Sequence, residues 1–222
     1  MLVKKYKVKL TLLEPLLGTV PKSEKVFRDY LADKALKRKE AAAKIDPEAA
    51  RALNEEEIDT LPTRDEEERG WTGFFTDEEG PFLYDYQVKG FIKEAGNVLK
   101  DFPDFDIPQL RDKVDNYVYV RPRRIRLAKV EPEPLERPLR AMTMQGPRVS
   151  LVRSDKVAAG TVLEFELWVL PFVLRGRKYG AGGREVFTQE LLSNLYEFGE
   201  FKGLGQWRNG GWGSFTAEIA PL

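Results

Sequence analysis

Residues 3–12 alternate between apolar and polar side chains, with the apolar ones on one face and lysines on most of the other. A period of two residues predicts a β-strand that is buried on one side. Similar patterns predict strands over residues 117–130, 149–152, 161–170 and 214–219. The hydrophobic pattern therefore predicts a sheet whose strands come from both ends of the chain.

Two other stretches repeat their apolar residues at the spacing of an α-helix. The first spans residues 85–100 and the second residues 188–198. Thr188 has the side chain of a good N-cap, and Gly199 fits the position just beyond a last helical turn. We therefore predict two amphipathic helices, each with one face turned towards the sheet.

Residues 23–69 interrupt this pattern after the first strand. The segment 23–53 is rich in Lys, Ala, Glu and Arg and reads as helical, with a division near Asp46-Pro47. Residues 55–69 are acidic and indicate a solvated loop. We predict that residues 23–69 are a helical and acidic insertion within a single domain that spans residues 1–222.

Read in order, the elements are strand, insertion, helix, strand, strand, strand, helix and strand, with connections predicted over residues 101–115 and 131–137. Without the insertion, this order is close to the split β-α-β-β-α-β arrangement. The predicted fold class is α+β: a ferredoxin-like (RRM-like) antiparallel sheet with two helices on one face, plus a helical insertion after the first strand.

The composition removes several classes of chemistry. The chain has no cysteine and no histidine, so it cannot form disulfides, thiolate zinc sites or serine-histidine triads. Its 36 basic residues balance its 36 acidic ones, which argues against a protein that coats polyanions over its whole surface. No apolar run approaches the roughly 20 residues of a membrane span. We expect a cytoplasmic protein with no cofactor, no metal and no membrane partner.

The positive charges are unevenly placed. Four basic zones lie at residues 121–129, 137–148 and 175–184 and at Arg208, far apart in sequence. Basic residues interleaved with aromatic rings are typical of surfaces that bind single-stranded nucleic acid. The aromatic residues in question are Tyr117, Tyr119, Tyr179, Trp207 and Trp212. The alternative is that each arginine pairs with a surface carboxylate and that the aromatic residues belong to the core.

The stretch Gly203–Gly213 holds five glycines around Arg208. Glycine allows a backbone to lie close to a phosphate chain and to present N–H donors to it. Arg208 would add a bidentate phosphate donor, and Trp207 or Trp212 a surface on which a base can stack. The alternative is a glycine-rich hairpin that closes an edge strand, with the tryptophans in the core.

Gly203-Leu-Gly205, five residues that include Arg208, and then Gly211-Trp-Gly213 resemble the glycine-rich signature of the CRISPR-associated RAMP superfamily. Residues 87–93 are similar to the start of the first helix in effector backbone subunits, and residues 153–165 to a further passage of the superfamily. The resemblance implies a ferredoxin-like fold and RNA binding through the glycine-rich loop, with Lys89, Lys93 and Arg208 on the RNA backbone. Repeat-processing members commonly use a histidine, which this chain lacks.

Two stretches, residues 80–86 and 121–126, also look like an uncharacterised family of tailed-phage early proteins. This second resemblance implies a stand-alone, phage-encoded relative of the effector backbone. Such a protein would coat nucleic acid or mimic an effector subunit.

The leading hypothesis is a non-catalytic protein that binds RNA or single-stranded nucleic acid. Further candidate partners are CRISPR effector subunits, or other copies of the chain in an oligomer. The alternatives are a metal-independent endoribonuclease, with Tyr84, Tyr86 and Lys89 or Lys178 and Tyr179 as its groups, and a protein-interaction module that interferes with effector assembly. The predicted nucleic-acid interface comprises Lys89, Lys93, Arg121, Arg123, Arg124, Arg126, Arg140, Arg148, Arg184, Gly203, Gly205, Trp207, Arg208, Gly211, Trp212 and Gly213.

Overall fold

The computed structural model describes residues 3–22, 71–100, 102, 105, 107–127, 130–143, 146–179 and 182–222. The predicted insertion, residues 23–69, lies outside these residues. The chain divides into two compact units, which are described separately below. Unit 1 comprises Met1–Leu16, Phe82–Ala128 and Ala158–Leu222, and unit 2 comprises Leu17–Pro81 and Lys129–Val157.

Unit 1 holds the first and the last described strands of the chain and its three described α-helices. The chain leaves it at β2 (Leu16–Leu17) and returns to it along β6 (Gly80–Tyr84). Its other elements are β1 (Lys4–Leu12), α3 (Asp85–Leu99), α4 (Leu110–Tyr117), β7 (Val118–Arg121), β8 (Arg124–Arg126), β11 (Val162–Val169), β12 (Val173–Leu174), a 3-10 turn η2 (Arg177–Tyr179), β13 (Arg184–Glu185), α5 (Gln189–Phe201), a 3-10 turn η3 (Arg208–Gly210) and β14 (Phe215–Pro221).

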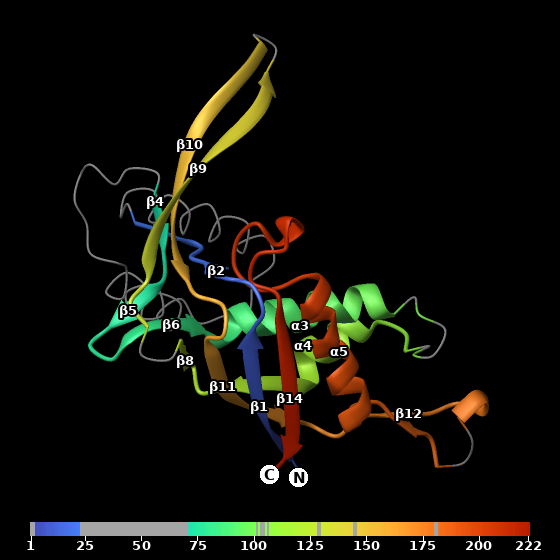
Figure 1. Ribbon diagram of the computed structural model, residues 1–222. Coiled ribbons are helices and arrows are strands. Elements are labelled where there is room, and N and C mark those ends of the chain that lie inside the picture. The colour runs from blue at the N-terminus through green and yellow to red at the C-terminus, as the bar shows by residue number, and fades with distance from the viewer. Residues whose placement is uncertain are drawn as a thin grey trace, which may run out of the picture. The chain divides into compact units, whose positions relative to one another are not determined.

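Four of these strands form an antiparallel sheet in the order β14-β1-β11-β7. The first strand of the chain therefore lies beside the last one, as Figure 1 shows, and Val8 faces both Phe165 and Ile219 in the register. In a separate pairing, β8 runs antiparallel to β6. The predicted α+β class with mainly antiparallel strands is confirmed.

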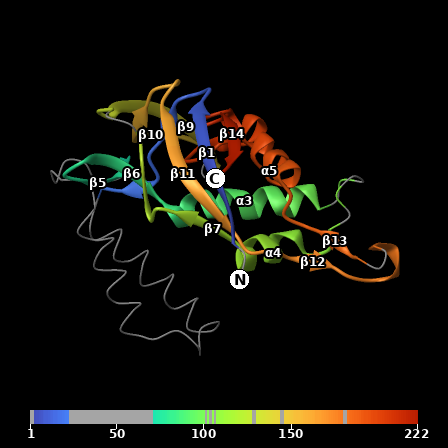
Figure 2. The same ribbon diagram turned by 90° about the horizontal axis from the view of Figure 1, so that it is seen from below.

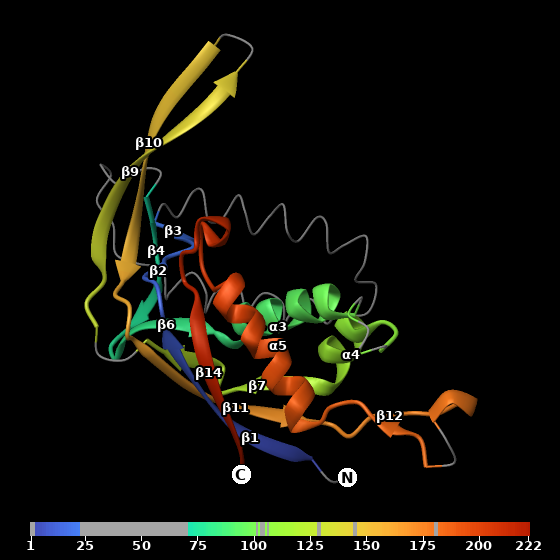
Figure 3. The same cartoon turned by 45° about the vertical axis from the view of Figure 1, so that its right-hand side comes forward.

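Burial along β1 follows the predicted alternation. Tyr6, Val8, Leu10 and Leu12 are buried, whereas the lysines between them lie on the opposite face. Figures 1 and 3 show α3, α4 and α5 together on one side of this sheet. The second side of the sheet carries the polar residues of the strands, because no helix of the described part of unit 1 lies on it.

The helices pack through aromatic residues. The ring of Phe91 on α3 lies 5.0 Å from the ring of Phe215 on β14 in an edge-on arrangement. Tyr196 of α5 is fully buried between Phe91 and Phe165 of the sheet, with ring centroids 6.2 Å away in both cases. These rings fix α3 and α5 against the sheet and against each other.

Two predictions about unit 1 differ from the structure. The described residues contain a third helix, α4, which begins in the predicted connection 101–115 and ends at Tyr117, where a strand was predicted to start. The expectation of two helices was therefore wrong. Leu110 and Val114 are its buried residues, and they pack beside Gly96 of α3. The helix α5 also continues past Gly199 to Phe201. Gly199 is a buried residue of α5. A glycine is needed there because the ring of Phe215 occupies the space that a Cβ would take.

Unit 2 contains β3 (Val20–Pro21), β4 (Trp71–Gly73), β5 (Phe75–Asp77), β9 (Glu133–Thr143) and β10 (Gly146–Val157). Strands β9 and β10 form a long antiparallel ribbon (Figure 1). The segment 131–137 was predicted to be a connection, which was wrong from Glu133 onward. Its prolines do not interrupt β9, because β9 pairs with β10 only and lies at the edge of the sheet.

Within unit 2, β4 runs parallel to β10 and antiparallel to β3. The Trp71 ring lies between two cations, 4.4 Å from Lys22 and 5.7 Å from Arg153. Lys22 also forms a largely buried ion pair with Asp155 at 3.1 Å. Asp155, which lies in the stretch 153–165 noted in the sequence, therefore has a structural partner in unit 2.

Candidate nucleic-acid interface

The glycine-rich loop between α5 and β14 is built around a crossing of two backbone segments. The N–H of Leu204 donates a hydrogen bond to the carbonyl of Gly213 at 2.9 Å, and the N–H of Gly213 donates to the carbonyl of Pro15 at 3.0 Å. A Cβ on Gly203 would overlap the carbonyl of Gly213, and one on Gly213 would overlap the carbonyl of Leu204. These two glycines are required because the two segments approach so closely.

The tip of the loop presents side chains rather than bare backbone. Gly205 and Gly211 have positive φ and frame the short turn η3. Trp207, itself at φ 59°, keeps 43% of its surface exposed, whereas Trp212 is half-buried. The loop therefore holds Trp207 and Arg208 at its tip.

Arg208 is tied to helix α3. Its guanidinium donates to the Glu94 carboxylate at 2.5 Å, and Lys202 contacts the other oxygen of that carboxylate at 2.7 Å. Burial would raise the pKa of Glu94, but the hydrogen bonds from Lys202 and Arg208 outweigh it and hold that pKa below its ordinary value. The ion pair fixes the loop on α3. It also neutralises part of the positive charge of Arg208 and Lys202.

The two lysines predicted on α3 meet one carboxylate at the end of α4. Lys93 lies 2.8 Å from an Asp115 carboxylate oxygen, and Lys89 donates to the Asp115 backbone carbonyl at 2.7 Å. The hydrogen bond from Lys93 lowers the pKa of Asp115. Burial lowers the pKa of Lys89, despite the nearby carboxylate. Both lysines are therefore held in fixed positions on one face of α3.

The arginines of β7 and β8 lie over aromatic rings. Arg123, which separates the two strands, lies 4.9 Å from the ring of Tyr84. Arg124 and Arg126 lie 5.2 Å and 5.4 Å from the ring of Phe82 on β6. Such cation–π contacts hold a guanidinium flat against a ring and leave its edge for other partners.

Trp168 of β11 lies on the side of the sheet that faces away from the helices, and cations from both neighbouring strands contact it. The Lys5 ammonium of β1 lies 4.2 Å from its ring, and the Arg121 guanidinium of β7 lies 6.0 Å from it. The indole N–H donates to Glu166 at 2.8 Å, which fixes the ring plane. In the register, Trp168 stands directly opposite Tyr119.

Tyr119 connects this sheet face to helix α3. The residue is 40% exposed, its hydroxyl donates to the Asn116 carbonyl at 3.0 Å, and the Lys89 ammonium lies 4.7 Å from the centre of its ring. Strand β7 lies at one edge of the sheet, and its backbone passes close to α3 (Figure 2). The contacts therefore form a track from the polar face of the sheet past this edge to α3. We call this track the edge-strand cluster: Lys5, Lys89, Tyr119, Arg121 and Trp168.

The start of α3 borders this cluster. Tyr86 is 38% exposed and stacks on Tyr84, with ring centroids 5.4 Å apart and planes 14° from parallel. Burial raises the pKa of Asp85, while the N–H of Tyr86 and the positive charge of Arg123 act against that rise. The carboxylates among these cations hold the side chains of the lysines and arginines in place. They also offset part of the positive charge of this surface.

Some residues of the predicted interface lie close together in the structure, and others lie apart from them. Lys89 and Arg121 join the edge-strand cluster, and Arg123 lies beside it. Arg184 on β13 instead donates to the carbonyl of Phe105 at 3.2 Å. Arg140 and Arg148 belong to β9 and β10 of unit 2, and their side chains lie outside the described part of the structure.

Two residues of the cluster were missed from the sequence. Lys5 and Trp168 occupy the polar phase of strands whose alternation was recognised, and neither was predicted to have a role. The signal was available, because a tryptophan in the polar phase of a half-buried strand faces away from the core. Their proximity follows only from the pairing of β1 with β11.

No family model matches the chain, and no curated protein matches it. Among solved structures, the chain is similar to one from a cryo-EM structure of the type III-B Cmr-beta complex bound to cognate target RNA. The sequence identity is 10%, the TM-score is 0.49, and the match covers 99% of this chain and 61% of that one. It is also similar to a chain of a type IV-B CRISPR complex, at 11% identity and a TM-score of 0.42, with 97% and 90% covered.

Across the part of the chain that the structure describes, none of the helices combines the length and the apolar character needed to cross a membrane.

Proposed function

We propose that this protein binds single-stranded RNA without cleaving it, through a ferredoxin-like domain of RAMP type. The edge-strand cluster carries the proposal, because it places three cations beside two aromatic rings, from strands β1 and β11 across the sheet to its edge strand β7 and to helix α3. The fold assignment is supported by the order β1, α3, β7, β11, α5, β14 and by the sheet order β14-β1-β11-β7. In this reading, residues 1–222 are one domain, and unit 2, with residues 23–69, is inserted between elements of unit 1.

In the proposed complex, bases stack on partly exposed rings while cations contact the phosphates. Tyr119 and Trp168 supply the rings, and Lys5, Lys89 and Arg121 supply the charges. A base stacked on an aromatic side chain contributes about 1–3 kcal/mol, and each phosphate contact adds salt dependence. This mode reads the shape of a single strand rather than its sequence.

The glycine-rich loop is proposed as a second contact, on the strength of the RAMP-like signature. Trp207 is the exposed ring at its tip, and Arg208 is the cation. To bind a phosphate, the guanidinium of Arg208 has to contact Glu94 and the phosphate together, or to break its ion pair with Glu94. The loop is therefore expected to contribute less than the edge-strand cluster.

The proposal is tested by titrating labelled single-stranded RNA and DNA at two or more salt concentrations. We expect binding to weaken with salt at a slope of about −0.7 per phosphate contacted. The Arg121→Ala variant should bind more weakly, whereas Lys100→Ala, which removes an exposed lysine just after α3, should bind like the wild type. No binding would refute RNA binding, and binding without a salt slope would refute the proposed phosphate contacts.

The same samples distinguish the two alternatives. RNA incubated with the protein in EDTA should stay intact, and 2′,3′-cyclic phosphate ends would instead indicate the metal-independent ribonuclease. A protein that fails to bind RNA but forms complexes with effector subunits in size-exclusion chromatography would instead be an interaction module, including the phage-encoded mimic.

A further inference from the structure

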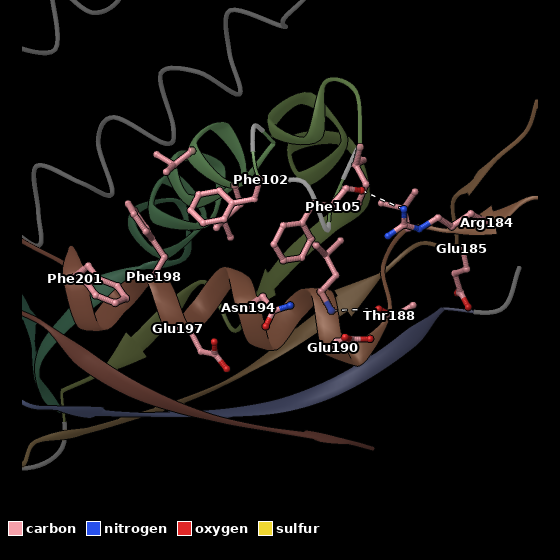
Figure 4. Close-up of a pocket in the computed structure, with 15 residues that line it drawn as sticks. Phe102, Phe105, Arg184, Glu185, Thr188, Glu190, Asn194, Glu197, Phe198 and Phe201 are labelled. Carbon is pink, nitrogen blue, oxygen red and sulfur yellow. Dashed lines mark hydrogen bonds between the residues drawn. The ribbon is translucent and has the colours of Figure 1, made fainter. Parts of the chain in front are cut away.

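A groove in unit 1 runs beside helix α5, at the end of α3 that lies away from the edge-strand cluster. Its volume is about 880 Å³. Figure 4 shows Phe198 and Phe201 entering it from α5, and Phe102 and Phe105 from the segment after α3. Its remaining apolar lining comes from Val98, Leu99, Ile107, Val186 and Leu191.

Several of these side chains are more exposed than a core residue would be. Phe201 is 81% exposed, Phe102 50% and Val98 39%. An apolar patch with aromatic rings in water is unfavourable, and on soluble proteins such patches usually mark binding sites. The groove has the apolar surface that an amphipathic helix needs for docking.

The charged residues of the groove are mainly acidic. Glu190 and Glu197 lie along one flank of α5 (Figure 4), and neither forms an ion pair with any residue that the structure describes. Arg184 donates to the Phe105 carbonyl, and Glu185 already binds Lys4. The charge that remains available is therefore negative and complements a basic partner.

We propose that this groove binds an amphipathic helix of a partner protein, with aromatic or aliphatic residues on one face and basic residues on its flank. Glu190 and Glu197 are seven residues apart, which places the two carboxylates about 10 Å apart along α5 at about 1.5 Å per residue. Basic residues seven positions apart on a docked helix would match them. The apolar face would then cover Val98, Phe198 and Phe201.

The groove and the edge-strand cluster can be occupied at the same time. Lys89 and Val98 are nine residues apart on α3, or about 14 Å along its axis. The acidic flank of α5 also repels a polyanion, so RNA is not the occupant. The groove therefore adds a protein partner to the proposed RNA-binding function and does not depend on that function.

The test uses a fluorescent 18-residue helical peptide with Leu and Phe on one face and Lys at two positions seven residues apart on the flank. A second peptide carries Glu in place of both Lys residues, and a third is a scrambled version of the first. The full-length protein should bind the Lys peptide at least tenfold more tightly than the other two. Equal binding of the Lys and scrambled peptides would overturn the proposal.

Variants of the protein locate the site. Phe201→Ser should weaken binding of the Lys peptide about tenfold, because the peptide loses an aromatic contact. It should not unfold the protein, because this ring is mostly in water in the unbound state. The double variant Glu190→Lys, Glu197→Lys should bind the Glu peptide in preference to the Lys peptide. Glu200→Lys, an exposed carboxylate of α5 outside the groove, is the matched control.

A charge reversal that leaves the peptide preference unchanged would overturn the site. RNA titrated into the peptide-bound protein distinguishes this failure from that of the proposed function. RNA should bind with unchanged affinity, and displacement of the peptide by RNA would show that the groove is part of the nucleic-acid interface.

Discussion

The glycine-rich loop and the edge-strand cluster differ in how they use the same residue types. In the loop, Gly203 and Gly213 allow two backbone segments to cross, and Arg208 binds Glu94. In the cluster, Arg121 and Lys89 lie over rings that remain partly in water. The comparison shows that a conspicuous sequence motif can have a packing role while the exposed chemistry is dispersed over several strands.

This contrast predicts different roles for the two regions. The glycines of the loop should matter mainly for stability, and the cluster mainly for RNA affinity. Substitutions in each region should therefore affect different measurements. Five predictions test that separation, starting with the largest expected effect.

Gly213→Ala should lower the free energy of unfolding by about 3 kcal/mol, because a Cβ there overlaps the Leu204 carbonyl and alanine is strained at φ 71°. Chemical denaturation measures the loss. Gly210→Ala is the control in the same loop, since its Cβ would meet only the Trp212 ring at ordinary distance. A Gly213→Ala protein of wild-type stability would show that the two segments do not cross as described.

The double variant Lys89→Ala, Arg121→Ala should weaken single-stranded RNA binding about a hundredfold at low salt and reduce the magnitude of the salt slope by about two phosphate contacts. The reason is the loss of two cations from one track. Fluorescence anisotropy at several salt concentrations measures both quantities. Equal loss from a Lys7→Ala, Lys9→Ala variant, whose lysines pair with Glu164 and Glu218, would argue for a diffuse charge effect instead.

Trp168→Ala should weaken RNA binding by about 1–2 kcal/mol through the loss of one stacking surface. Its effect on unfolding should be smaller than that of removing a core ring, because Trp168 faces away from the helices. Trp168→Phe, which keeps a ring, should recover most of the affinity. The idea fails if Trp168→Ala and the wild type bind equally well while Trp207→Ala loses affinity.

Glu94→Gln should cost under about 1 kcal/mol of stability at neutral pH, as expected for a partly exposed ion pair. The folded state lowers the pKa of Glu94, so its stabilisation is present above the unfolded pKa of about 4.3 and is lost as the pH falls through the folded pKa. The stability difference between wild type and variant should therefore shrink below about pH 4. A difference that grows with acid would contradict this sign.

The same Glu94→Gln variant tests the loop as a second RNA contact. Removing the carboxylate releases Arg208 and Lys202, so RNA should bind about two- to threefold more tightly if the loop takes part. Unchanged affinity would assign the loop to packing alone. Either result refines the comparison between the two regions.

Much of the fold could be predicted from the sequence because its local signals are strong. The alternation of β1, the helical spacing of α3 and the Thr188 cap, which accepts a hydrogen bond from the Leu191 N–H, all appear as expected. Helix α4 could not be foreseen, since most of its residues are polar and only Leu110 and Val114 are buried. Its formation depends on packing against Gly96, which is a tertiary effect.

The candidate site was harder to predict than the fold. Lys89, Arg121 and Arg208 were singled out from charge and motif, but their partners were invisible in the sequence. Whether an arginine binds a carboxylate or lies over a ring depends on strand register and helix docking. Lys5 and Trp168 were missed for the same reason, since they are far apart in sequence and meet only across β1 and β11.

Photo-cross-linking of single-stranded RNA containing 4-thiouridine, followed by mass spectrometry of the linked peptides, tests the central claim most directly. The edge-strand cluster predicts links in the peptides that contain Tyr119 and Trp168, and a loss of these links in the Lys89→Ala, Arg121→Ala protein. Links confined to the peptide that contains Trp207 and Trp212 would contradict the claim and place RNA on the glycine-rich loop instead.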